Sequence, residues 1–172
     1  MTAPVKSPAR PTDRHAAASV VAELAERCGR RAFAIAYDLL RNPADAEDAV
    51  QESLARLHLA YPTLRDSDAA EGWLFRCLTN LCLKQIRRRG VRTKLAHLFR
   101  REPLAPSAHF ETKLRSALDR LPARQQVAVV LRHAHDYGVA DIAETMGISA
   151  STAKTHLSRG LASLRKHLGE QS

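Results

Sequence analysis

The sequence predicts an all-α protein in which two small helical domains are joined by a flexible linker. Apolar residues recur at spacings of three and four along most of the chain, and no alternating pattern of useful length indicates a strand. Aromatic residues make up only 5% of the 172 residues, with 7 glycines and 8 prolines, which argues against a turn-rich β-sandwich or barrel. Because 45% of the residues are hydrophobic, the chain can bury a core.

The first domain is expected over residues 15–90, after a disordered tail at 1–14 that contains three prolines. Its first helix is indicated by a buried stripe over residues 20–40, where apolar side chains follow helical spacing. A second helix has a clear start, because Asn42 can cap it and Pro43 fits its first position.

This second helix ends at Pro62, and the polar residues 63–72 are expected to form a loop. Another helical stripe follows from Trp73 to Ile86 and continues into a run of arginines. From Gly90 the pattern weakens and two prolines appear, so residues 91–109 are expected to be an interdomain linker with at most a short helical turn.

The second domain, residues 110–172, is expected to hold four helices, of which the last two form a helix-turn-helix. Ala143 is the small residue that allows the two helices to cross closely. Gly147 permits a left-handed turn, and Ser149 can cap the final helix. The outward residues of that final helix are short or basic, which suits a helix that enters the major groove of DNA.

The charge is strongly positive and unevenly distributed. There are 27 Lys and Arg residues against 18 Asp and Glu, which gives a net charge of +9 and predicts a polyanionic partner such as nucleic acid. Residues 84–101 hold eight basic side chains and no acidic one, whereas residues 38–52 hold five acidic side chains and one basic one. An acidic face and a basic face on one small domain suggest two different partners.

Other features exclude whole classes of protein. No apolar run approaches the ~18–20 residues that a membrane span needs, and the N-terminal segment lacks the apolar stretch of a secretory signal. The 3 cysteines cannot all pair with one another, which fits a reducing cytoplasm. We therefore expect a cytoplasmic protein without membrane insertion.

Catalytic patterns are missing from the sequence as well. It contains no glycine-rich phosphate loop, nucleophile elbow or carboxylate set of catalytic spacing. His133, His135 and Asp136 approach a metal-binding set, but residues two apart on a helix point about 200° away from each other. We expect no enzymatic activity, no metal site and no cofactor.

Two blocks of the sequence resemble bacterial RNA polymerase sigma factors of the extracytoplasmic-function (ECF) type. Residues 20–90, which include YDLLRNPADAEDAVQESLARLHLAY and WLFRCLTNLCLKQIRRR, are similar to sigma region 2. Residues 110–168, which include ADIAETMGISASTAKTHLSRGLASLRKHL, are similar to sigma region 4. The resemblance implies a dissociable subunit that directs core RNA polymerase to the promoters of a specialised, stress-type or envelope-type regulon.

The resemblance also implies which residues bind. Four residues match the acidic motif that contacts the clamp helices of the largest polymerase subunit: Asp45, Asp48, Gln51 and Glu52. The loop at 61–72 and the helix after it match the part that opens the −10 element and captures a flipped base, with contacts expected from Arg76, Asn80, Lys84, Arg87 and Arg88. Trp73 lies on the apolar stripe and is expected to pack in the core.

The second block implies contacts to the −35 element and to the polymerase flap. The residues that match the −35 reading helix are Ser151, Thr152, Lys154, Thr155, His156 and Arg159. Those that match the flap contact are Leu121, Pro122, Arg124 and Arg132. An anti-sigma factor packed between the two domains is a further implied partner.

The sequence departs from the family pattern in both blocks. Lys84 stands where the family usually has Asp, Thr79 where it has Arg, and His156 replaces an arginine of the recognition helix. Gly160 is expected to weaken that helix by roughly 1 kcal/mol relative to Ala. These departures affect which promoter sequence we expect the protein to recognise, and they do not change the class of protein.

Two alternatives remain open. An autonomous helix-turn-helix regulator would explain the second domain but would give no role to the acidic motif. A sigma-mimicking protein that sequesters an anti-sigma factor should lack basic DNA-facing residues, and both helices expected to face DNA are basic here. We also expect the free protein to bind promoter DNA poorly, because a flexible linker leaves the spacing of its two domains unset.

Overall fold

The computed structural model describes residues 11–64, 67–98 and 110–169. All the regular elements in these ranges are helices, which confirms the all-α prediction. They are α1 (Pro11–Leu40), α2 (Pro43–Ala60), the short 3-10 helix η1 (Tyr61–Thr63), α3 (Ser67–Leu98), α4 (Phe110–Asp119), α5 (Ala123–Ala134), α6 (Val139–Met146) and α7 (Ala150–Gly169).

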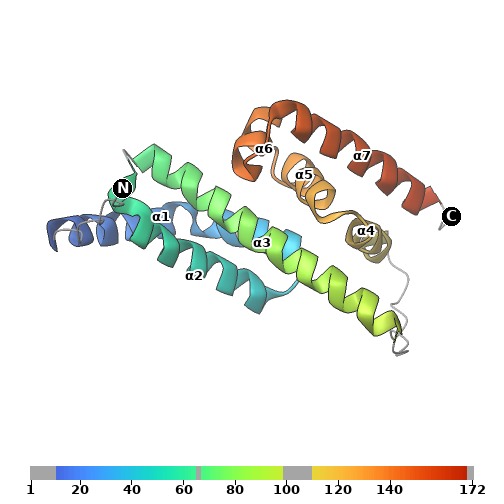
Figure 1. Cartoon of the computed structure of the whole chain (residues 1–172), viewed down its shortest axis with the longest axis horizontal. Helices are drawn as coiled ribbons and strands as arrows, with labels where there is room; N and C mark the ends of the chain where they lie inside the picture. The colour runs from blue at the N-terminus through green and yellow to red at the C-terminus, as the bar shows by residue number, and fades with distance from the viewer. Residues whose placement is uncertain (1–10, 65–66, 99–109, 170–172) are drawn as a thin grey trace, which may run out of the picture.

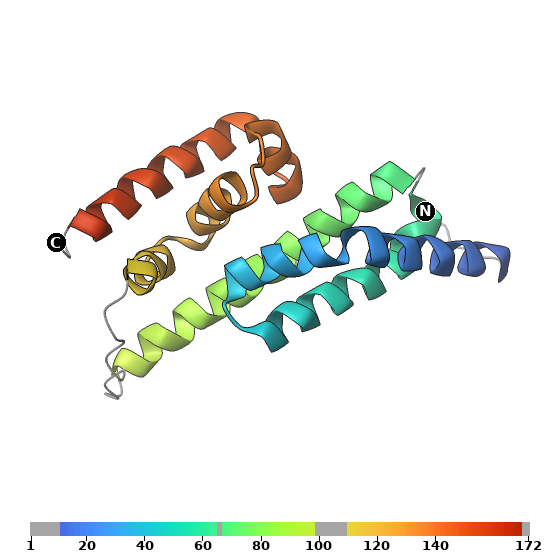
Figure 2. The ribbon, with the colours of Figure 1, turned by 180° about the vertical axis from the view of Figure 1, so that it is seen from behind.

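Two groups of helices lie side by side. Helices α1, α2 and α3 form one bundle, and α4 to α7 form a second group that rests against α1 and α3 (Figures 1 and 2). The first bundle buries large apolar side chains from all three helices, among them Leu24, Ile35, Leu57 and Leu74. The second group does the same between α5, α6 and α7, and the buried residues of both groups form one continuous cluster.

The start of α2 confirms the predicted capping. Asn42 has an extended backbone, and its Oδ1 accepts a hydrogen bond of 3.0 Å from the backbone N–H of Asp45. Pro43 occupies the first turn, where the lack of an N–H costs nothing. The preceding residue, Arg41, has a φ of 54°, so a non-glycine residue in the left-handed region turns the chain from α1 into α2.

Three predicted boundaries are corrected, one in α1 and two in α3. Helix α1 already begins at Pro11, inside the segment expected to be a disordered tail, because proline is compatible with a first helical turn and residues 16–18 are all alanine, the strongest helix former. Residues 1–10 of that tail lie outside the described residues.

Helix α3 is longer than predicted at both ends. It begins at Ser67, so the loop expected at 63–72 is much shorter, and it runs through Gly90 to Leu98, inside the expected linker 91–109. One glycine costs a helix only about 1 kcal/mol relative to alanine, and no proline occurs between Pro62 and Pro103. Residues 99–109 lie outside the described part of the chain.

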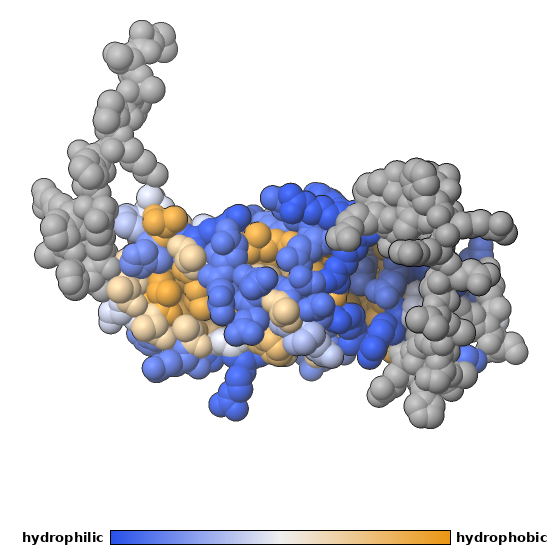
Figure 3. Space-filling model, turned by 90° about the horizontal axis from the view of Figure 1, so that it is seen from below, coloured by the Kyte–Doolittle hydropathy of each residue, from blue (hydrophilic) through white to orange (hydrophobic). Residues whose placement is uncertain are grey.

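The molecular surface is mainly polar. Figure 3 shows hydrophilic residues over most of the face seen from below, with apolar surface at the end where α1 begins and α2 ends. Among the described residues, the exposed large hydrophobic side chains are Phe33, Tyr37 and Leu59. None of the helices in the described ranges is long and apolar enough to cross a membrane.

Candidate functional site

An acidic face lies on α2. Asp48, Gln51 and Glu52 are spaced so that they share one side of the helix, and all three are exposed. Each of the latter two is tied to a neighbour on the same helix: Gln51 Nε2 donates to Glu47 Oε1 at 3.4 Å, and Arg56 Nε donates to Glu52 Oε1 at 2.7 Å. The opposite side of α2 is buried through Ala46, Ala49, Ser53 and Leu57. The packing of α2 therefore directs the acidic face outward.

Asp45 is placed differently from the other three residues of the acidic motif. The Arg89 guanidinium, from α3, donates both to the Asp45 carboxylate and to the backbone carbonyl of Leu40 at the end of α1. Asp45 thus takes part in joining three helices, whereas Asp48, Gln51 and Glu52 remain available. The sequence offered no signal for this contact, because Arg89 sits inside a run of basic residues 44 positions away.

A basic stripe follows α3. Arg76, Asn80 and Lys84 are four residues apart and all exposed, and Arg87 and Arg88 extend the same surface by one more turn. Trp73 is half-buried against the hydrophobic cluster, in line with its expected role in packing. Thr79, one of the departures from the family pattern, is 1% exposed and belongs to the interior of the bundle.

The acidic face and the basic stripe meet in one groove. From α2 it is lined by Asp48, Gln51, Glu52 and Arg56, and from α3 by Leu81, Lys84, Gln85 and Arg88. The two sets of predicted contacts are therefore neighbours on one surface.

The turn between α6 and α7 has the geometry that the sequence predicts. Gly147 adopts φ 63° and ψ 43°, its N–H donates to the carbonyl of Glu144 at 3.1 Å, and the N–H of Ile148 donates to that of Ala143 at 2.9 Å. Ser149 Oγ accepts a 3.2 Å hydrogen bond from the N–H of Thr152, which caps α7. These contacts terminate α6 and start the recognition helix.

Helix α7 presents a mixed hydroxyl and basic surface. Ser151, Lys154, Thr155 and Arg159 are exposed, whereas Thr152 and His156 are half-buried. Burial, together with the nearby Arg124 and Arg159, lowers the pKa of His156 below its usual range. Arg124 lies in the first turn of α5, so α5 and α7 both bring positive charge to this surface.

Gly160 has a packing role that the sequence did not reveal. It is buried where α7 crosses α5, and a Cβ built on it would lie 2.7 Å from Val129 Cγ2. A side chain would therefore force the two helices apart. Glycine at this position is explained by the crossing and not only by its low helix propensity.

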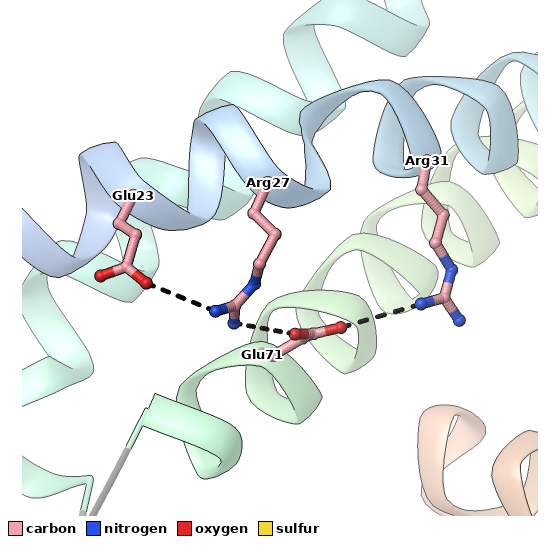
Figure 4. Close-up of polar contacts among 4 residues, drawn as sticks. All are labelled: Glu23, Arg27, Arg31 and Glu71. Atoms are coloured by element: carbon pink, nitrogen blue, oxygen red, sulfur yellow. Dashed lines mark hydrogen bonds and ion pairs between the residues drawn. The ribbon is translucent and has the colours of Figure 1, made fainter.

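Two arginines of α1 contact α3 and the segment between α5 and α6. Arg27 Nη2 lies 3.0 Å from Glu71 Oε2, and Arg31 Nη1 lies 3.7 Å from Glu71 Oε1, while Arg27 also pairs with Glu23 at 3.4 Å (Figure 4). The guanidinium of Arg31 lies over two aromatic rings, 4.7 Å from the centroid of Phe75 and 5.1 Å from that of Tyr137.

The two histidines considered as metal ligands lie in different environments. His133 is exposed on α5, whereas His135 points toward α1 and its Nε2 lies 3.0 Å from Asp38 Oδ2. His135 thus contributes to the contact between the two groups of helices.

Comparison with known proteins matches two family models to this chain. The family model described as "Sigma-70 region 2" matches residues 24–92, and the one described as "Sigma-70, region 4" matches residues 111–164. Two solved structures share the fold. A sigma factor RpoE in complex with the anti-sigma factor NepR from Bartonella quintana is 24% identical with a TM-score of 0.58, covering 91% of this chain and 96% of that one. CnrH in complex with the cytosolic domain of CnrY is 22% identical with a TM-score of 0.64, covering 93% and 99%.

Relatives in sequence are more similar. The ECF RNA polymerase sigma factor SigM of Mycobacterium tuberculosis is 33% identical over 150 residues, which cover 86% of this chain and 76% of SigM. The ECF RNA polymerase sigma factor SigE of Mycolicibacterium smegmatis is 32% identical over 160 residues, 87% of this chain, and the match spans only 62% of the longer relative. The chain therefore belongs to the extracytoplasmic-function family of RNA polymerase sigma factors.

Proposed function

We propose that this protein binds core RNA polymerase and directs it to the promoters of a specialised regulon. The observation that carries the proposal is the arrangement of three exposed faces on one chain of this family. An acidic face on α2 borders a basic stripe on α3, and a separate recognition helix, α7, carries further basic residues. A regulator that acts without polymerase has no use for the acidic face.

The polymerase contact is assigned to α2. Asp48, Gln51 and Glu52 are exposed on one side of a rigid helix whose other side is buried, so they can meet a complementary basic surface such as that of the clamp helices. Asp45 lies in the first turn of α2, where its carboxylate accepts a hydrogen bond from Arg89 and so helps to hold the acidic face in place. We assign residues 15–90 to polymerase and −10 binding.

The nucleic-acid contacts are assigned to α3 and α7. Arg76, Lys84, Arg87 and Arg88 would neutralise phosphates near the −10 element, with Asn80 placed among them to contact a base or the backbone. Residues 110–172 would bind the −35 element as duplex DNA. The contacts in α7 are Ser151, Thr152, Lys154, Thr155, His156 and Arg159.

Further parts of the proposal follow from the family. Both solved relatives are complexes, with the anti-sigma factor NepR and with the cytosolic domain of CnrY, which supports an anti-sigma partner for this chain too. Action on RNA polymerase places the protein in the cytoplasm, as a binding subunit rather than an enzyme.

The polymerase contact is tested by substituting Asp48 with a residue of opposite charge. We expect Asp48→Arg to reduce co-purification with core polymerase at least tenfold while the helical circular dichroism is unchanged. Glu26→Arg is the matched control, because Glu26 is an exposed acid on α1 away from α2, and it should bind normally. Equal binding by both variants, or no binding by the unmodified protein, would overturn the assignment.

A further inference from the structure

The basic run at residues 84–101 extends further than the DNA contacts assigned to it. Those contacts end at Arg88, but the run continues without an acidic residue and includes Arg92 and Lys94. Both residues belong to α3, which is helical through Leu98. Residues 90–98, the α3 extension, therefore carry positive charge that the −10 contacts do not use.

The α3 extension projects beyond the bundle formed by α1, α2 and α3 (Figures 1 and 2). Arg89 lies where α3 passes the end of this bundle, because its guanidinium donates to the Leu40 carbonyl at the end of α1 and to the Asp45 carboxylate in the first turn of α2. Among the α3 residues whose burial the structure describes, Leu83 is the last buried one. Contact with the core thus decreases well before the helix ends.

The helical repeat continues the basic stripe into the α3 extension. Position 92 follows Arg88 by four residues, and position 94 follows Arg87 by seven, which is close to two turns. These two positions therefore lengthen the stripe by more than one turn. Like charges at such spacings destabilise a helix, and the run at 84–101 contains no acid of its own to offset them. A polyanion bound along the stripe would remove this repulsion.

The length of the α3 extension carries it past the −10 element. Positions 80 and 94 are 14 residues apart, which is about 21 Å along the helix axis at ~1.5 Å per residue. The same distance along duplex DNA is about six base pairs at ~3.4 Å each. When α3 lies along the DNA with Asn80 at the flipped base of the −10 element, position 94 therefore reaches DNA outside that element.

Chain connectivity decides on which side of the −10 element the α3 extension lies. The −10 and −35 elements are centred about 25 base pairs apart, which is about 85 Å of duplex. The chain from Leu98 to Phe110 spans at most about 42 Å, and the lengths of α4 and α7 with one interhelical distance add at most about 55 Å.

A downstream direction of α3 exceeds this reach. The helix continues for about 27 Å after Asn80, so a downstream direction would leave its end about 112 Å from the −35 element. An upstream direction leaves about 58 Å, which the chain can span. The α3 extension therefore points toward the spacer, the duplex between the two elements.

We propose that the α3 extension binds the backbone of the spacer duplex immediately upstream of the −10 element, through Arg92 and Lys94. Its ligand is double-stranded DNA, recognised by its phosphates and not by its sequence. The inference rests on the proposed function and adds a third promoter contact between the −10 and −35 contacts. Phosphate contacts of this kind fix the register and orientation of a protein on the duplex, here beside the site where the −10 strands separate.

The test uses holoenzyme made from core polymerase and the full-length protein, with a promoter found by run-off transcription. One promoter fragment has a single-stranded −10 non-template strand and a duplex spacer. A second carries uncharged methylphosphonates at the spacer phosphates within about six base pairs of the −10 element. We expect the unmodified holoenzyme to bind the second fragment about fivefold more weakly, because these phosphates no longer attract the α3 extension.

The variant that tests the contact is Arg92→Gln with Lys94→Gln, since glutamine keeps the helix propensity and removes the charge. It should bind the two fragments alike. On the fragment with natural phosphates, the slope of log affinity against log salt concentration should fall by about two units. The matched control is Arg30→Gln with Arg120→Gln, which removes the same charge at exposed positions on α1 and after α4, and it should discriminate between the fragments as the unmodified protein does.

Equal discrimination by the Arg92→Gln, Lys94→Gln variant and its control would overturn the proposal. An equal loss of affinity for a fragment without spacer duplex would also overturn it, because the two residues would then contact the single strand. Weaker co-elution of this variant with core polymerase would assign the residues to the polymerase instead. Failure of the unmodified protein to co-elute would contradict the proposed function, whereas co-elution without discrimination between the fragments contradicts the spacer contact alone.

The need for a continuous helix is tested without a change of charge. Thr93→Pro removes a backbone N–H and clashes with the carbonyl four residues earlier, which breaks the α3 extension. We expect this variant to lose discrimination between the fragments as fully as the charge variant does, whereas Thr93→Ala should keep it. Full discrimination by Thr93→Pro would show that the helix does not place the contact, and it would contradict the proposal.

Discussion

Gly160 allows two helices to approach more closely than any residue with a side chain would permit. Its missing Cβ would meet Val129 at 2.7 Å, and both the Cβ and the carbonyl oxygen of Gln125 would lie at 3.3 Å. Because the carbonyl belongs to the backbone of α5, it cannot move aside as a flexible side chain can. The crossing fixes α7 on α5 and so determines how the recognition helix is presented.

Gly160→Ala should therefore destabilise the protein, by about 1–3 kcal/mol from overpacking, although alanine is the better helix former. The free energy of unfolding is measured by urea denaturation. Gly90→Ala is the matched control in α3, where a Cβ would meet nothing within 4 Å, and it should stabilise the protein by up to about 1 kcal/mol. A Gly160→Ala protein as stable as the unmodified one would refute the packing role.

His156 is a second residue with a measurable consequence. Burial first, then the proximity of Arg124 and Arg159, lowers its pKa below the usual 6.5, so the free protein carries a neutral imidazole at neutral pH. A DNA phosphate near the ring would favour its protonated form, and binding should therefore strengthen as the pH falls.

We expect the polymerase-bound protein to bind duplex −35 DNA roughly two- to fivefold more tightly at pH 6 than at pH 8, the effect of one exposed charge pair. His156→Arg should lose this part of the pH dependence because arginine stays charged. His133→Gln, at an exposed position on α5, serves as the control. The same pH profile for the His156→Arg and unmodified proteins would show that His156 does not approach a phosphate.

At the scale of elements, the helix boundaries marked by a capping or turn residue were predicted correctly, and those without such a residue were not. The capping of α2 by Asn42 and the turn at Gly147 were predicted and are confirmed, because both depend on residues within one turn of each other. The end of α3 lies beyond the predicted one, because the apolar pattern weakens from Gly90 although a single glycine does not end a helix. Arg89 contacts α1 and α2, which no local pattern records.

Arg89 offers a prediction at this scale. Arg89→Ala removes the donor that joins α3 to the Leu40 carbonyl and to the Asp45 carboxylate, and it should lower the free energy of unfolding by about 1 kcal/mol, the value of such hydrogen bonds near the surface. Arg87→Ala, an exposed position on the same helix, should have a smaller effect. Urea denaturation of the two variants measures the difference. Equal stabilities would show that Arg89 does not help to hold α2 in position.

At the scale of the whole molecule, the net charge of +9 is divided between an acidic face on α2 and basic surfaces on α3 and α7. The basic stripe of α3 and the recognition helix face outward as predicted, because helical spacing alone decides which side of a buried helix remains exposed. The contact between the two groups of helices could not be predicted, since it pairs residues such as Arg31 and Tyr137 that lie far apart in the sequence.

The most direct test of the central claim is run-off transcription on total genomic DNA by core polymerase from the source bacterium, with and without this protein, followed by sequencing of the transcripts. The account predicts a defined set of transcripts that require the protein, share upstream −10 and −35 elements, and disappear with Asp48→Arg but not with Glu26→Arg. A transcript set that does not change when the protein is added would contradict it.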